Sequence, residues 1–307
     1  NIISRGNPLI ESILNNNLKY QSGPQWLYEN ILHDKWVLAV AGTHGKTSTS
    51  SMLAWILETN GLAPGFLIGG IPNNFEVSAR LPIDDKKNFP TFFIIEADEY
   101  DTAFFDKRSK FIHYHPNTLI LNNLEFDHAD IFENIEHIEK HFHHLIRTLS
   151  NKSKIIFNNH SESIKQVLKK GCWSEIEDFG FKGKWTYKEI NENEFEIYYK
   201  KKSQGRVKWN LIGNHNSLNA LASIAAAKHV GISPSKSIIA LNKFKNVKKR
   251  MELLESIKDI DIYDDFAHHP TAIKTTLEGL RKKIGSKKII AVIEPRSNTM
   301  KLGKMKN

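Results

Sequence analysis

The stretch "WVLAVAGTHGKTSTS" (36–50) joins an apolar run to a glycine-containing turn and a Ser/Thr-rich segment. The apolar run 36–41 predicts a buried β-strand, and residues 47–61 have the spacing of a helix that ends at a glycine. In phosphate-binding loops a strand, a glycine turn with Lys-Thr and a helix follow one another in this order. Backbone N–H groups at the start of the helix then face the phosphates. We therefore predict a phosphate-binding loop here.

The residues expected to contact the phosphates are Gly42, Thr43, His44, Gly45, Lys46, Thr47 and Ser48. Lys46 is predicted to bridge the β- and γ-phosphates of a nucleotide, and Thr47 to hold Mg²⁺ through its hydroxyl. The general motif has a glycine five positions before Gly45, where this sequence has Val40. An ordinary glycine turn before a helix is therefore the alternative.

Outside this stretch, apolar runs and helix-like segments alternate along the chain. Buried strands are predicted at 91–98, 117–124 and 153–159, and helices at 8–17, 135–149 and 161–170. Such alternation is typical of an α/β fold in which a mainly parallel sheet is covered by helices on both faces. We predict that fold class for the central part of the chain.

The pattern changes after residue 176. Residues 195–213 predict an antiparallel hairpin that turns at Ser-Gln-Gly (203–205), and a small-residue helix is predicted at 214–231. A second strand–helix pattern then begins, with strands at 250–256, 259–267 and 287–294 and a helix at 269–285. We place a domain boundary near residues 246–250.

The composition narrows the possible partners. The 307 residues include 43 Lys and Arg against 34 Asp and Glu, a net charge of +9, which suits nucleic acid or small anionic substrates. No arginine-rich stripe with interleaved aromatics is present, so we expect no nucleic-acid partner.

The single Cys172 excludes a disulfide within the chain and a cysteine-based zinc site. No apolar run approaches the roughly 20 residues that cross a bilayer, so we expect a cytoplasmic protein with no membrane partner.

Two polar segments follow predicted strands and bring candidate metal ligands to one sheet edge. Ligands of α/β proteins bind at the carboxyl ends of the strands. "EADEYD" (96–101) places Glu96 there, where it can hold a metal ion bound to a nucleotide. "NNLEFDHAD" (122–130) places His128 at the same edge, although Mg²⁺ prefers oxygen ligands. A solvated acidic loop and a structural histidine are the alternatives.

Three further segments carry residues of interest on the residue pattern alone. Asn216 and Asn219 lie three apart on one helix face, where amides can bind an adenine edge or simply cap and pack. Arg250, in "KKRME", can reach a γ-phosphate from a second domain or lie on a solvated surface. The histidines at 137, 141 and 144 have helical spacing, and we interpret them as a solvated helix face rather than a metal site.

These motifs, taken in order, resemble those of the Mur ligase family, ATP-dependent enzymes that join an amine to a carboxylate of a UDP-muramic acid precursor. The resemblance covers "GTHGKTS", "EADEYD", "NLEFDHAD", "GNHNSLNALA", "KKRME" and "DDFAHHPTAI". It implies three domains: residues 1–35 as the tail of an N-terminal UDP-binding domain, 36–248 as the central ATPase, and 249–307 as the beginning of a Rossmann-like C-terminal domain. On this reading the chain lacks most of the UDP-sugar site.

The resemblance also implies roles for the candidate residues. Lys46, Glu96, His128 and Arg250 are the expected catalytic residues, and Thr47, Glu96 and His128 the expected Mg²⁺ ligands. His215, Asn216 and Asn219 are expected to contact the base of ATP, and Arg250 and Asp265 its phosphate and ribose. Arg296, Ser297 and Asn298, in "EPRSNTMKLG", are expected to face an incoming peptide.

The segment "EADEYDTAFFDKRSKFIHYHPNTLILNNLEFDHADIF" resembles the branch of the family that recycles cell-wall peptide. It implies that the tripeptide L-Ala-γ-D-Glu-meso-diaminopimelate is joined to UDP-N-acetylmuramate through an acyl phosphate. The alternatives are a UDP-N-acetylmuramate–L-alanine ligase, a folylpolyglutamate-type ligase, and an ATP-binding fragment without ligase activity.

Overall fold

A ten-stranded sheet forms the centre of the computed structural model, which describes residues 3–83, 90–126 and 132–294. Its strand order is β12-β11-β10-β9-β8-β7-β1-β4-β2-β3, and the seven strands from β10 to β2 in this order run parallel. This confirms the predicted α/β class with a mainly parallel sheet.

The strands of this sheet are β1 (Trp36–Ala41), β2 (Gly65–Leu67), β3 (Ala79–Arg80), β4 (Phe92–Ala97), β7 (Thr118–Leu121), β8 (Lys154–Asn158), β9 (Glu175–Phe179), β10 (Trp185–Asn191), β11 (Glu194–Tyr199) and β12 (Lys202–Lys208). The helices are α1 (Pro8–Asn15), α2 (Gly23–Leu27), α3 (Lys46–Thr59), α4 (Ile135–Arg147), α5 (Glu162–Lys169), α6 (Asn214–His229), α7 (Pro234–Leu241) and α8 (Pro270–Ile284). Two-stranded sheets are formed by β5 (Asp101–Ala103) with β6 (Asp106–Ser109), and by β13 (Glu252–Ile257) with β14 (Ile260–Asp264).

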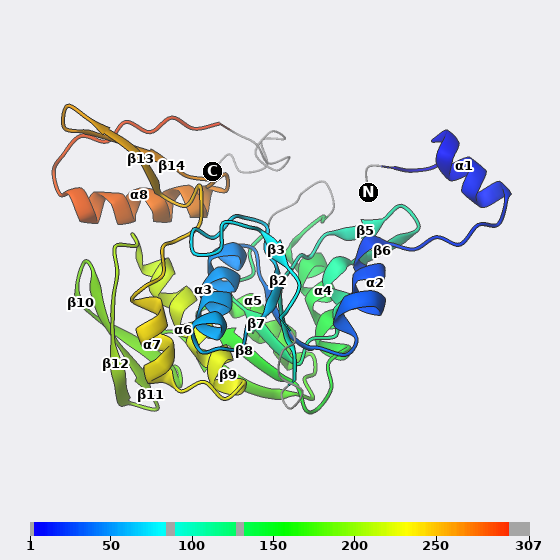
Figure 1. Ribbon diagram of the computed structural model, residues 1–307, viewed down its shortest axis with the longest axis horizontal. Helices are drawn as coiled ribbons and strands as arrows, with labels where there is room; N and C mark the ends of the chain where they lie inside the picture. Colours follow the sequence, from blue (N-terminus) through cyan, green and yellow to red (C-terminus); the bar gives the residue numbers. More distant parts are fainter. Residues whose placement is uncertain (1–2, 84–89, 127–131, 295–307) are drawn as a thin grey trace.

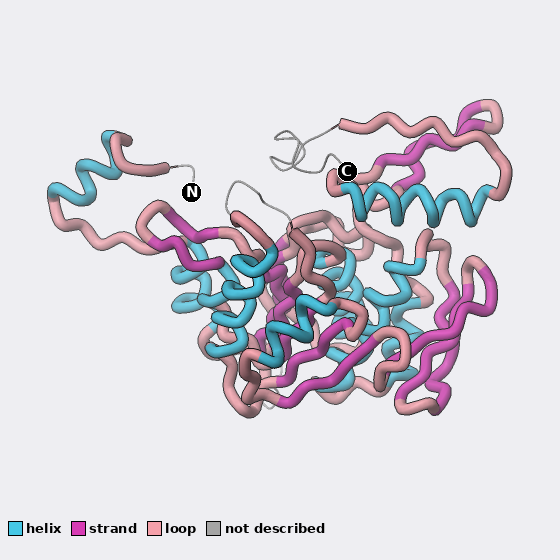
Figure 2. Tube along the Cα trace, turned by 180° about the vertical axis from the view of Figure 1, so that it is seen from behind, coloured by secondary structure: helices cyan, strands magenta, loops and turns pink. Residues whose placement is uncertain are grey.

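Helices cover both faces of the ten-stranded sheet (Figure 1), as they must when a parallel sheet is buried on both sides. Successive residues of β1 point to opposite faces. Leu38 and Val40 join the core that contains α3, α6 and α7, whereas Val37 and Ala39 join the core that contains α4 and α5. An uninterrupted apolar strand is therefore required at this position. The view from behind in Figure 2 shows α1 extending away from this body, and it has no buried residue.

The turn between β1 and α3 depends on two glycines. Gly42 has φ +134° and Gly45 has φ +80°, and L-residues with a side chain rarely adopt such values. A Cβ at Gly42 would lie 2.8 Å from the carbonyl oxygen of Asn123, and one at Gly45 would lie 2.7 Å from Oδ1 of Asn219. The loop therefore packs directly against the end of β7 and against α6.

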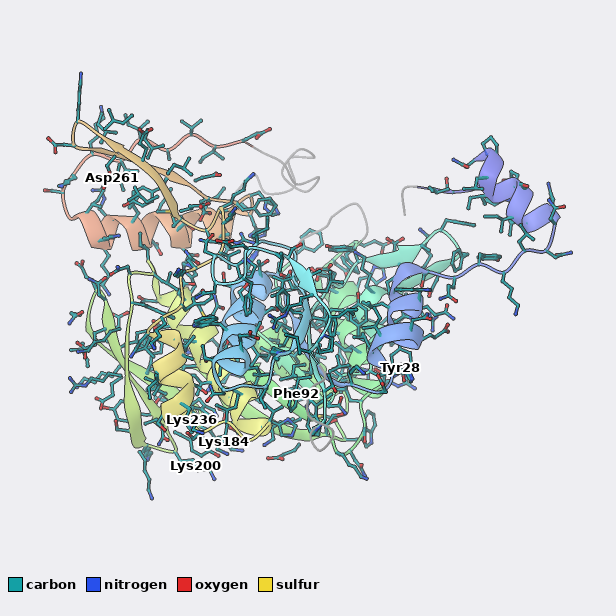
Figure 3. All side chains as sticks on the ribbon, in the orientation of Figure 1. Tyr28, Phe92, Lys184, Lys200, Lys236 and Asp261 are labelled. Carbon is teal, nitrogen blue, oxygen red and sulfur yellow. The ribbon has the colours of Figure 1, made fainter. Side chains whose placement is uncertain are left out.

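The β11–β12 hairpin confirms the predicted antiparallel pair, but the predicted turn at residues 203–205 is wrong. The chain turns at Lys200 and Lys201, whose φ angles are +48° and +65°, as a two-residue hairpin turn requires. Figure 3 marks Lys200 at the edge of the molecule opposite Asp261 of β14. Gly205 instead lies within β12, beside a register shift, and a Cβ there would meet Ile238 at 3.3 Å. The glycine thus permits an irregular strand to approach α7 closely.

Residues after 249 form the β13–β14 hairpin and α8, above the edge of the large sheet (Figure 1). The predicted strand at 287–294 is wrong, because the described residues there are in neither strand nor helix, and Val292 is 95% exposed. A strand requires a neighbour for its backbone hydrogen bonds, and within the described ranges this segment pairs with none. Among the described helices, none combines the length and apolar character needed to span a membrane.

We predict that Ile56→Ala lowers the free energy of unfolding by about 2–5 kcal/mol, because Ile56 of α3 is fully buried in the core beneath the loop. Ile239→Ala is the matched control, since Ile239 of α7 is 60% exposed, and the expected change is below about 0.5 kcal/mol. Denaturant unfolding curves of the two variants measure both values. An equal decrease in the free energy of unfolding in both variants would contradict the assignment of α3 to the core.

Candidate active site

Lys46 is the first residue of α3 and lies largely but not fully buried at the carboxyl end of β1. Its Nζ donates to the carbonyl oxygen of Gly42 at 2.7 Å and to Oε2 of Glu99 at 3.2 Å, and it lies 3.8 Å from Oδ1 of Asp98. Burial lowers the pKa of Lys46, but the neighbouring carboxylates outweigh burial and hold the pKa above its usual value. Lys46 is therefore a fixed positive charge at the loop.

Glu96 lies near the end of β4, where the parallel register places it beside Val40 of β1. The backbone N–H of Gly69 donates to Oε1 of Glu96 at 2.8 Å, and the hydroxyl of Thr47 also hydrogen-bonds to this carboxylate. Burial raises the pKa of Glu96, and the nearby Asp98 raises it further. Thr47 and Glu96 thus present hydroxyl and carboxylate oxygens together, the donor set that a hard cation such as Mg²⁺ prefers.

Two asparagines that end β7 support the loop, and sequence reasoning missed both. Asn123 brackets His44: its Oδ1 accepts from the backbone N–H of His44 at 2.7 Å, and its Nδ2 donates to the carbonyl oxygen of His44 at 3.1 Å. Asn122 donates through Nδ2 to Oγ1 of Thr49 at 2.8 Å and to Oδ1 of Asn219 at 3.3 Å. The sequence feature that could have identified them is their position directly after a predicted strand, at the same sheet edge as the loop.

The predicted base-contacting residues of α6 lie in different surroundings. Asn219 is buried against Gly45, so the structure brings it to the loop. Asn216 is also buried, but its Nδ2 donates to the carbonyl oxygen of Ile212, one turn earlier. His215 is partly buried, and burial lowers its pKa, so the ring is neutral near pH 7. A neutral ring and amides can form hydrogen bonds to a base without adding charge.

Arg250 reaches the loop from beyond the predicted domain boundary. Its Nη2 donates to Oγ1 of Thr47 at 3.3 Å, and its guanidinium lies 5.1 Å from the ring centre of Phe266. Burial lowers the pKa of Arg250, and Asp265 opposes this effect. The Asp265 carboxylate accepts from the backbone N–H groups of Met251 and Ala267, both at 2.8 Å, and so holds the segment that carries Arg250.

The remaining predicted residues lie outside the described residues. These are His128, proposed as a metal ligand, and Arg296, Ser297 and Asn298, proposed to face a peptide. The structure therefore places Lys46, Thr47, Glu96, Asn219 and Arg250 around one loop and adds Asn122, Asn123, Asp98 and Glu99 to it.

The histidines of α4 differ from the solvated face that the sequence predicted. His141 is half-buried beside the ring of Phe132, and its Nδ1 is 2.7 Å from Oγ of Ser109. Burial lowers the pKa of His141 to about 4, and the nearby His137 and His144 contribute in the same direction. Among the described residues, these three histidines do not belong to a cluster of metal-ligating side chains. The face is therefore partly covered, because the ring of Phe132 packs against His137 and His141.

The loop fits a bound phosphate and the metal ion that accompanies it. Both glycines hold the backbone where a side chain would collide with its support, and the loop opens directly into the N-terminus of α3. The N-terminus of a helix attracts negative charge. Lys46 and Arg250 add two positive side chains, and Thr47 with Glu96 supplies the oxygen ligands.

Comparison with protein families gives two matches within the chain. Residues 40–227 match the Mur ligase middle domain, and residues 249–304 match the Mur ligase, glutamate ligase domain. The first match alone covers more than half of the 307 residues.

Individual proteins similar to the chain carry more specific names. The UDP-N-acetylmuramate–L-alanyl-gamma-D-glutamyl-meso-2,6-diaminoheptandioate ligases of Escherichia coli (strain K12) and Haemophilus influenzae are 54% and 51% identical over 99% of the chain. The chain spans 66% of the length of each of these relatives. A crystal structure of a murein peptide ligase from Psychrobacter arcticus matches 98% of the chain with 44% identity and a TM-score of 0.79. The match covers 66% of the length of the Psychrobacter chain. The UDP-N-acetylmuramate–L-alanine ligase of Dictyoglomus turgidum is 30% identical over 89% of the chain and 57% of its own length.

We predict that the protein loses stability as the pH falls from about 6.5 to about 4, in part because of His141. An unfolded histidine takes up a proton near pH 6.5, whereas His141 in the folded chain does so only near its lowered pKa of about 4. Between these values the unfolded state binds more protons, so acid favours it. The free energy of unfolding, measured by denaturant titration across this range, should depend less on pH in His141→Gln. His268→Gln is the control and should keep the wild-type slope; an unchanged slope in His141→Gln would contradict the prediction.

Proposed function

This chain belongs to the Mur ligase family, and we propose that it takes part in an ATP-dependent reaction that joins L-Ala-γ-D-Glu-meso-diaminopimelate to UDP-N-acetylmuramate. The observation that carries the proposal is the 54% identity, over 99% of the chain, with a relative named for this reaction. The relative named for L-alanine addition is only 30% identical. Because the chain spans 66% of its first relatives, the activity is proposed for the protein to which these residues belong.

The reaction needs activation because a carboxylate is a poor acylating agent. In the proposed sequence the muramate carboxylate attacks the γ-phosphate of ATP, the bond to ADP breaks, and an acyl phosphate forms. The free α-amine of the tripeptide then attacks the acyl carbon, inorganic phosphate leaves with the bonding electrons, and the amine loses a proton. Two anions meet in the first step, so positive charge at the phosphate loop lowers its barrier.

The residues of this chain supply that charge and hold it in place. Lys46 already lies at the loop, where Glu99 and Asp98 position it, and phosphate oxygens can take the place of these carboxylates. Thr47 and Glu96 would hold the Mg²⁺ ion, which when bound neutralises phosphate charge and polarises the phosphoryl group. Arg250 donates to Thr47 and so lies where it can reach the same phosphates from the C-terminal side.

The domain organisation and location follow from the same proposal. We infer that residues 36–248 form the ATPase unit and that 249–307 begin a C-terminal domain that brings Arg250 to the loop. His128 is kept as a ligand of a second Mg²⁺ ion, and Arg296, Ser297 and Asn298 as peptide contacts. The cytoplasm is the proposed location, because the reaction consumes ATP and a UDP-linked sugar.

The substrate assignment is tested by competition. The reading frame extended to its natural ends is given ATP, Mg²⁺ and UDP-N-acetylmuramate, with equal concentrations of the tripeptide and L-alanine, and the products are weighed by mass spectrometry. We expect the tripeptide adduct to exceed the L-alanine adduct at least about tenfold, since one extra contact worth about 1.4 kcal/mol suffices for that ratio. A dominant L-alanine adduct would instead identify the activity as that of a UDP-N-acetylmuramate–L-alanine ligase. If neither adduct forms although ATP binds, the protein is a nucleotide-binding protein without this ligase activity.

We predict that Lys46→Ala lowers the rate of ATP-dependent product formation at least about 100-fold, because a positioned charge at a phosphoryl group contributes on this order. Lys165→Ala is the matched control; Lys165 of α5 pairs with Glu162 on the surface, and its loss should leave the rate unchanged. The same mass-spectrometric assay measures both variants. Wild-type rates in Lys46→Ala would overturn the role of the loop.

A further inference from the structure

Three side chains meet beside the phosphate loop without a role in the reaction proposed above. They are His44 of the loop, Glu125 after β7, and His269, the N-cap residue of α8. Oε2 of Glu125 lies 3.6 Å from Nε2 of His44 and 4.0 Å from Nδ1 of His269. The two imidazole rings are 4.5 Å apart between centres. The proposed phosphate site uses the backbone of His44, so its ring is available for another purpose.

We propose that His44, Glu125 and His269 bind one divalent transition-metal ion, for which Zn²⁺ is the best fit, and that this ion ties α8 to the phosphate loop. One ligand atom from each residue lies within 4.8 Å of the other two. Two imidazole nitrogens and one carboxylate oxygen form a donor set that suits zinc and neighbouring transition metals. This site shares no residue with the oxygen ligands of Thr47 and Glu96.

The two distances from the Glu125 oxygen to the histidine nitrogens can be compared with those that zinc requires. Zinc–ligand bonds of about 2.0–2.1 Å in a tetrahedral site separate two ligand atoms by roughly 3.3 Å. The observed 3.6 Å between His44 and Glu125 is near this value, and the 4.0 Å between Glu125 and His269 must shorten by roughly 0.7 Å. Small side-chain rotations supply such a change. Three protein ligands leave the fourth position for water.

Neighbouring groups already orient these ligands. Oγ1 of Thr271 donates to Oε2 of Glu125 at 2.7 Å, the kind of outer contact that fixes a ligating carboxylate. The neighbouring His44, 3.6 Å away, and the hydrogen bond from Thr271 lower the pKa of Glu125 despite burial, so the carboxylate is ionised. The backbone N–H of Thr271 donates to Nδ1 of His269 at 3.2 Å, so this nitrogen carries no proton and its lone pair is the one that a metal ion would use. Binding through Nδ1 exchanges this N–H contact for the metal.

The ion would affect how the two parts of the chain hold together. His44 and Glu125 belong to the loop and to the end of β7, whereas His269 begins α8 in the C-terminal segment that also carries Arg250. A metal that binds only this folded arrangement stabilises it by mass action. Zinc should therefore raise the melting temperature and keep Arg250 beside Thr47.

The test measures metal binding directly and uses no ligase assay, so its result is independent of the proposed reaction. The metal-free protein is dialysed against Zn²⁺, and bound metal is counted; Co²⁺ is used in parallel because its visible absorption reports tetrahedral coordination. We expect one tightly bound ion per chain. Glu125→Gln and His269→Gln should each weaken its affinity at least about tenfold, as expected for loss of one ligand.

His268→Gln and His137→Gln are the matched controls, since each removes a histidine outside the cluster, and both should retain wild-type affinity. Melting curves without metal establish that each variant is folded. If His269→Gln fails to fold because α8 loses its N-cap, Glu125→Gln decides the question, since glutamine can still accept the bond from Thr271. No stoichiometric ion in the wild type, or equal affinity in Glu125→Gln, would overturn the proposal.

Discussion

The close contact between the loop at residues 42–45 and the asparagines that end β7 is the constraint on which the site depends. Asn123 fixes the backbone of His44 on both sides, and Asn122 joins α3 to Asn219 of α6. This contact leaves no space for a side chain at Gly42 or Gly45. The loop is consequently held by the strand end and by α6 before any phosphate arrives, and ordering it costs little entropy on binding.

Charge at the loop is balanced within the protein itself. Lys46 is buried among Asp98, Glu99 and Glu96, and a buried ammonium without such partners would lose its proton. Burial, and to a lesser extent the nearby Asp98, raise the pKa of Glu96. In the proposed site a phosphate with its cation would relieve both conditions, because the phosphate would pair with Lys46 and the cation with Glu96. The arrangement therefore favours a bound metal–phosphate pair over either ion alone.

The sequence predicted those features that depend on neighbours along the chain. The apolar run of β1, the glycine turn and the amphipathic helices are local, and they lie where predicted. The turn at Lys200 was missed because Gly205 is a stronger local turn signal, although close approach to Ile238 determines its place. The predicted strand at 287–294 lacks a partner in the described ranges, and strand propensity alone cannot supply one. Asn122, Asn123 and the cluster around Glu125 could not be assigned, because their partners come from distant segments.

The contacts of α8 show why the C-terminal segment and the loop act together. Its N-terminal end is fixed by buried His269 and by the bond from Thr271 to Glu125, whereas its other end has the exposed ion pair of Lys282 with Glu189. An exposed pair contributes about 0–1 kcal/mol, so the N-terminal end is the firmer attachment. Gly279 adds a close backbone contact, since a Cβ there would lie 3.0 Å from Cα of Gly213. Because Gly279 lies in the half of α8 that also carries Lys282, this contact strengthens the far end, and α8 is attached to the rest of the chain at both ends.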